Sequence, residues 1–105
     1  MEIKNADIKV EVDVKKLETV AFILKTIAHP LRIGIISLLA EHDKMCVTDI
    51  CEKLSSEQSL TSHHLANMKM AGILEKNRIG KNIYYSLKLK EVLHVIECMN
   101  NCHLI

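Results

Sequence analysis

Aromatic residues are scarce in this chain of 105 residues, which has two Tyr, one Phe and no Trp, although 49% of its residues are hydrophobic. The core must therefore be built from aliphatic side chains and Met, a composition that suits packed helices. The chain also lacks any apolar run near the ~20 residues that a membrane helix needs, and no basic-then-apolar signal sequence opens it. We therefore expect a cytoplasmic protein without a membrane segment.

The length predicts one domain with a modest core, near the size at which dimerisation commonly supplements stability. The four cysteines are expected to be reduced thiols in the cytosol and free for chemistry. No nucleophile, base and orienting group occur together at a spacing that would form a catalytic cleft, so the sequence does not predict an enzyme.

Charge is unevenly distributed along the chain, whose formal net charge is only +1. Residues 57–90 hold six Lys or Arg against two Glu, whereas the segments before and after them are slightly acidic. A basic segment of this kind is where a surface for a polyanion would be expected.

Apolar residues at helical spacing predict five helices. We expect them over about residues 13–28, from Pro30 through a buried apolar stretch, over 47–54, from Ser55–Gln58 to Gly72, and over 90–101. Thr48 is expected to cap the third helix, and Ser55 with Gln58 to form a capping box for the fourth. Leu60, His64, Leu65, Met68 and Ala71 are expected on one side of that fourth helix.

Two segments show the alternation of a β-strand. Residues 1–14 read as either a half-buried strand or a loose arm. Between Ile73 and Leu87 the alternation predicts a β-hairpin, with Ile73, Glu75 and Asn77 opposite Ile83, Tyr85 and Leu87 around Gly80-Lys81-Asn82.

A short helix, a turn and a helix with a polar tip form a helix-turn-helix, whose second helix enters the major groove of DNA. At that tip, Gln58 can bond adenine with its amide, Thr61 can pack its methyl group on thymine, and Ser59 and Ser62 can bond bases or phosphates. The free N–H groups of the helix N-terminus also attract phosphate.

The basic hairpin then serves as a wing. Arg78 and Lys81 can reach a phosphate backbone or a minor groove from it. The alternative interpretation of the same pattern is a helical hairpin with a capped polar face that binds no DNA.

Residues 28–87 also resemble the ArsR/SmtB family of dimeric winged-helix repressors. The similarity lies in AHPLRIGIISLL, in QSLTSHHLANMKMAGIL and in GKNIYYSL. It implies a mainly α fold with a small β-hairpin: one winged-helix domain over 1–105, with an N-terminal arm over 1–12 and a C-terminal dimerisation helix over 89–105. Such repressors bind operator DNA as homodimers joined through their first and last helices, and an inducer releases them. The resemblance adds His63 to the predicted DNA-reading residues, while His64 matches a position that packs or bridges helices.

The resemblance extends to a thiol metal site at the start of the third helix. The arsenite-responsive branch has three cysteines there, and this chain keeps two of them, Cys46 and Cys51, with Thr48 in place of the middle one. Soft thiolates suit As(III), Cd(II) or Pb(II), but a trigonal site needs a third ligand from elsewhere. Ordinary buried thiols are the alternative.

The last predicted helix offers a second group of ligands. His94, Cys98 and Cys102 share a face at i, i+4 and i+8, so another metal site or a redox switch through the two thiols is possible. The sequence thus predicts a DNA-binding repressor that an inducer releases, with a soft metal or metalloid as the leading inducer. The alternatives are a thiol-based redox-responsive repressor and a protein-interaction module on the same fold.

Overall fold

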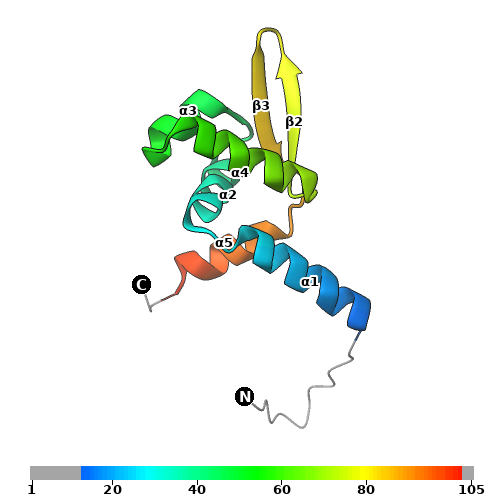
Figure 1. The fold of residues 1–105 in the computed structure, drawn as a ribbon. Helices are drawn as coiled ribbons and strands as arrows, with labels where there is room; N and C mark the ends of the chain where they lie inside the picture. Colours follow the sequence, from blue (N-terminus) through cyan, green and yellow to red (C-terminus); the bar gives the residue numbers. More distant parts are fainter. Residues whose placement is uncertain (1–12, 103–105) are drawn as a thin grey trace.

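The computed structural model describes residues 13–102, which form a mainly helical domain with a small antiparallel sheet (Figure 1). Its elements in chain order are α1 (Val14–Ile27), α2 (Pro30–Glu41), β1 (Met45–Cys46), α3 (Val47–Leu54), α4 (Gln58–Met70), β2 (Leu74–Ile79), β3 (Asn82–Leu87) and α5 (Val92–Asn100). The predicted arm over 1–12 lies outside the described residues. The five predicted helices are confirmed, each with bounds close to those expected from the sequence.

The first two helices begin where local chemistry predicts. The Asp13 carboxylate accepts hydrogen bonds from the backbone N–H groups of Lys15 at 3.1 Å and Lys16 at 3.3 Å. Nδ1 of His29 accepts the N–H of Leu31 at 3.1 Å, with Pro30 at the first position of α2. Within residues 13–102 no single helix is long and apolar enough to cross a membrane; α1 and α2 pass that test only as a pair, bent by 98°.

The two predicted caps around α3 and α4 are wrong. Cys46 is the N-cap of α3 and makes no side-chain cap bond, while Thr48 lies within the helix. Ser55 instead ends α3 in the left-handed conformation with φ of 50°, and Glu57 is the N-cap of α4. Because α4 begins at Gln58 with Glu57 as its N-cap, Ser55 lies too early in the chain to cap it.

Gly72 ends α4 as predicted. Its φ is +82°, and its N–H donates to the carbonyl of Lys69 at 3.0 Å, while that of Ile73 donates to Met68 at 3.0 Å. A residue with a side chain would be strained in this conformation, so Gly fixes the point at which the chain leaves the helix for β2.

The predicted hairpin is confirmed, but its pairing differs from the expected one by one residue. Glu75 pairs with Ser86 and Asn77 with Tyr84. The strands are joined by the two residues Gly80-Lys81, and Gly80 has the positive φ, +63°, that the first position of a type II′ turn requires. The sequence pattern did not predict β1, which pairs with β3 so that the sheet order is β1-β3-β2.

The core lies between α2, α3, α4, α5 and the inner face of the sheet, and it is almost entirely aliphatic. Its buried hydrophobic residues are Ile27, Ile35, Ile36, Leu39, Met45, Ile50, Leu65, Met68, Ile73, Leu74, Tyr85, Leu87, Val92 and Ile96. The hairpin projects away from the helices, and α1 extends away from the helix-turn-helix (Figure 1). The core therefore holds α4 and the base of the hairpin in a fixed relation.

Candidate nucleic-acid interface

Helix α4 has one face in the core and one face in solvent. Thr61, His64, Leu65 and Met68 form the buried face. Leu60 lies one residue off this stripe and is 48% exposed, so its predicted place on the inner side is wrong. The spacing of three and four residues along the buried stripe leaves the polar tip of the helix facing outward.

The outward face carries four of the predicted DNA-reading residues. Gln58, Ser59 and His63 are exposed and Ser62 is half-buried. The Ser59 hydroxyl donates to Oε1 of Glu57 at 2.6 Å, and Nε2 of His63 lies 3.1 Å from Nδ2 of Asn67. The tip is thus polar and partly ordered by its own hydrogen bonds.

Thr61 is a correction to the predicted set. Its side chain is fully buried, and its hydroxyl lies 2.7 Å from that of Ser56 and donates to the Glu57 carbonyl at 2.8 Å. A methyl group enclosed in this way cannot reach a thymine. The residue instead ties the turn between α3 and α4 to the first turn of α4.

The exposed face of α4 is longer than the predicted set of residues. Ala66 and Met70 continue it toward the C-terminal end, and the Met70 side chain is 87% exposed. Both are apolar, so they were not among the residues predicted from the sequence to contact DNA. Their spacing from Ser59 and Ser62 is the signal that could have found them, because it repeats every three to four residues.

His64 lies beneath this face and bridges helices, as the sequence predicted. Arg32 of α2 donates its Nε–H to Nδ1 of His64 at 2.9 Å, and the ring of His29 lies 4.4 Å from the His64 ring between centroids. Burial lowers the pKa of His64, and the neighbouring His29, Arg32 and His63 lower it further.

The two predicted wing residues lie at the end of the hairpin. Arg78 and Lys81 are both exposed, and Nε of Arg78 donates to the carbonyl of Gly80 at 3.3 Å. The hairpin that carries these cations projects from the domain, away from the helices (Figure 1).

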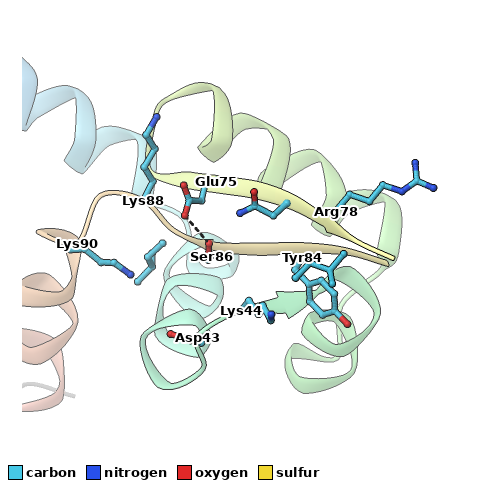
Figure 2. A pocket seen from close by; sticks show the side chains of 11 residues that line it. Asp43, Lys44, Glu75, Arg78, Tyr84, Ser86, Lys88 and Lys90 are labelled. Atoms are coloured by element: carbon cyan, nitrogen blue, oxygen red, sulfur yellow. Dashed lines mark hydrogen bonds between the residues drawn. The ribbon is translucent and has the colours of Figure 1, made fainter. Parts of the chain in front are cut away.

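A polar hollow of about 590 Å³ opens beside the sheet and adds cations that sequence reasoning missed. Figure 2 shows Glu75 and Ser86 near its centre, where the Ser86 hydroxyl donates to the Glu75 carboxylate at 3.3 Å. Its charged lining residues are Asp43, Lys44, Glu75, Arg78, Lys88 and Lys90. Four cations against two carboxylates give it a positive excess. Lys44 lies 5.4 Å over the Tyr84 ring and comes from outside the basic segment, so only the fold brings it here.

The predicted thiol ligands are free but do not form a complete metal site within the described residues. Cys46 and Cys51 are both half-buried, and they lie five positions apart across the start of α3. Within residues 13–102 no three His, Cys, Asp or Glu side chains come close enough to hold a metal ion together. The described residues therefore do not fit a three-coordinate thiolate site.

The second predicted group lies on α5. His94, Cys98 and Cys102 line one shallow apolar hollow of about 430 Å³ together with Val95 and Met99. Nδ1 of His94 lies 3.9 Å from the carboxylate of Glu97. The structure thus brings the three residues to one surface, but they do not form a three-ligand cluster there.

The known proteins that this chain resembles are named as regulators of transcription. The family described as "Bacterial regulatory protein, arsR family" matches residues 29–76. The chain is 38% identical over 90 residues to the transcriptional repressor PagR of Bacillus anthracis, covering 86% of this chain and 90% of that protein. It is 30% identical over 79 residues to the cadmium resistance transcriptional regulatory protein CadC of Listeria innocua, covering 75% and 66%. The crystal structure of PagR matches with a TM-score of 0.76 and 39% identity, covering 84% of this chain and 100% of that one.

Proposed function

We propose that this chain, which belongs to the bacterial arsR family of regulatory proteins, represses transcription by binding an operator as a homodimer and reading it with the outward face of α4. The observation that carries the proposal is the division of α4 into a fully packed inner side and an exposed polar tip. A helix held in this way can enter a major groove without losing core contacts.

The side chains at the tip of α4 match the chemistry of base edges and phosphates. The Gln58 amide offers the donor and acceptor pair that suits adenine, and Ser62 and His63 lie one turn further along the same face. At the wing, Arg78 and Lys81 offer positive charge to the phosphate backbone. The lysines of the hollow in Figure 2 extend that charge along the sheet.

A homodimer is supported by apolar surface that the chain leaves uncovered. On α1, the side chains of Val14, Leu17 and Phe22 are each more than half exposed, at 62%, 56% and 55%. Residues of α1 and α5 also line a shared apolar hollow. We infer that a second copy covers this surface, which would place two α4 tips on one DNA duplex.

The inducer is a separate question. The name of CadC links that relative to cadmium resistance, so a soft metal such as Cd(II), Pb(II) or As(III) is our leading candidate for this chain. The described residues supply Cys46 and Cys51 but no third ligand near them, so we derive no release step through a metal. Redox chemistry at Cys98 and Cys102 is the second candidate, supported by their common place on the surface of α5. Single Cys→Ser variants distinguish the two candidates, because each removes one thiol and so disrupts only one of the two pairs.

The proposed function is tested by selecting DNA from a random duplex library with the full chain. We expect enrichment of an inverted repeat whose half-sites lie about one helical turn apart. Affinity for the selected duplex should fall steeply as salt rises, because the basic residues release counterions when they contact phosphate. A chain that enriches no sequence and binds all duplexes equally weakly would instead favour the protein-interaction module.

A further inference from the structure

One arginine connects three helices beneath the outward face of α4. Arg32 donates its Nε–H to Nδ1 of His64 at 2.9 Å and its Nη1–H to the carbonyl of Thr26 at 2.9 Å. Thr26 lies in the last turn of α1, where carbonyl groups have no partner within their own helix. The guanidinium of α2 therefore joins the end of α1 to the middle of α4.

The hydrogen bond from Arg32 to α4 requires a particular protonation state of His64. Nδ1 can accept from Arg32 only when it carries no proton, so the ring is neutral with its proton on Nε2. Nε2 is buried and has no hydrogen-bond partner among the described residues. A second proton, on Nδ1, would face the Arg32 N–H and place two positive charges side by side. The bridge therefore exists only while His64 is neutral.

The surroundings of His64 oppose protonation, and no carboxylate among residues 13–102 acts on the ring to stabilise its charged form. The charged or titratable groups that act on it are His29 at the corner between α1 and α2, Arg32 on α2 and His63 on α4 itself. From the described residues of α3 and β2, which also pack on α4, no such group acts on it. Burial is the largest cause that lowers the pKa of His64, so the ring is neutral near pH 7 and is protonated only on acidification.

We propose that Arg32 and His64 are a positioning pair that holds the DNA-reading helix against the end of α1, and that protonation of His64 breaks this bridge and weakens operator binding. This inference rests on the proposed function, because its readout is operator affinity. Neither side chain needs to touch DNA. The pair acts by fixing where Ser62 and His63 stand relative to the apolar surface of α1.

The same protonation affects folding, and its sign follows from the lowered pKa. A histidine whose pKa is lower in the folded than in the unfolded chain contributes stability that is fully present above its ordinary value of about 6.5. That stability is lost as the pH falls below this value and through the lowered pKa of the folded state. Operator binding should weaken over the same acidic range.

The test compares operator affinity at about pH 7.5 and about pH 5.5 for the wild type, His64→Asn and His42→Asn. Asn keeps an acceptor near the position of Nδ1 but does not titrate. We expect the wild type to lose about three- to tenfold more affinity on acidification than His64→Asn, the effect of one hydrogen bond. His42, the exposed C-cap of α2, is the matched control and should keep the wild-type pH profile.

Equal losses in the wild type and His64→Asn would overturn the proposal. Arg32→Lys provides a second variant, because it keeps the charge but not the Nε–H; it should bind more weakly near neutral pH and show a flatter profile. Nitrogen NMR of the wild-type histidine rings tests the hydrogen bond between Arg32 and His64 without DNA. A neutral His64 protonated at Nε2 supports the pair, whereas one protonated at Nδ1 overturns it. If the chain selects no operator, the proposed function fails while this measurement still judges the pair.

Discussion

Helices α1 and α4 both carry an apolar stripe at helical spacing, but only α4 has its stripe covered by its own chain. Leu65 and Met68 of α4 are fully buried, whereas Leu17 and Leu24 of α1 are 56% and 48% exposed. The difference shows that a hydrophobic stripe predicts a covered face without telling what covers it. In α4 the cover is the core, and in α1 we propose that it is a second copy.

The largest effect is expected at Leu65, on the buried face of α4. Replacing it with Ala should reduce the free energy of unfolding by about 2–5 kcal/mol, because it leaves a cavity under the DNA-reading helix. Urea unfolding at two protein concentrations would measure this. Leu60→Ala on the same helix is the control, and its half-exposed side chain should cost about 0.5 kcal/mol or less. Equal effects of the two variants would show that α4 is not packed as described.

A smaller effect is expected on α1, where the quantity that changes is the free energy of dimerisation. Phe22→Lys should weaken dimerisation by about 1–3 kcal/mol, because it places a charge in an apolar interface. Sedimentation at several concentrations would measure it, with Lys16→Ala as an exposed control on the same helix. If Phe22→Lys leaves the association of the chains unchanged, the exposed apolar surface of α1 at Phe22 is not part of the interface.

The smallest effect on stability is expected at Thr61, which lies on the buried side of α4. Thr61→Val should cost about 0.5–1.5 kcal/mol of stability, since it leaves the Ser56 hydroxyl without its partner. Base preference should stay the same, because the side chain faces the core. Thermal unfolding and operator competition together test this. A changed base preference with unchanged stability would restore the direct DNA contact that the sequence suggested.

Features set by neighbouring residues were predictable from the sequence. Asp13 and Pro30 marked two helix starts, and Gly72 marked the end of α4, because each acts through its own backbone or through groups within a few positions. The hairpin was predictable from its alternation. Its register was not, because Ile83, Tyr84 and Tyr85 form a continuous apolar run that fits either pairing.

Features set by distant residues were not predictable. The strand β1 has two residues and no periodicity, so it exists only through its pairing with β3. Arg32 and His64 are 32 positions apart, and nothing local signals their bond. Thr61 looked like a DNA contact because a Thr near a helix start is commonly exposed. Its hydroxyl is satisfied by the nearby Ser56 and Glu57, but its burial follows from the packing of α4 into the core, which no local pattern shows.

The double variant Ser62→Ala with His63→Ala tests whether the outward face of α4 reads DNA. The measurement is fluorescence anisotropy with the selected inverted repeat and with a shuffled duplex of equal length, using Lys81→Ala for comparison. We expect the double variant to lose about 1–3 kcal/mol of discrimination between the two duplexes while keeping its weak, salt-dependent binding. Lys81→Ala should weaken both duplexes alike. A double variant that discriminates as well as the wild type would contradict the assignment of α4 as the helix that reads DNA.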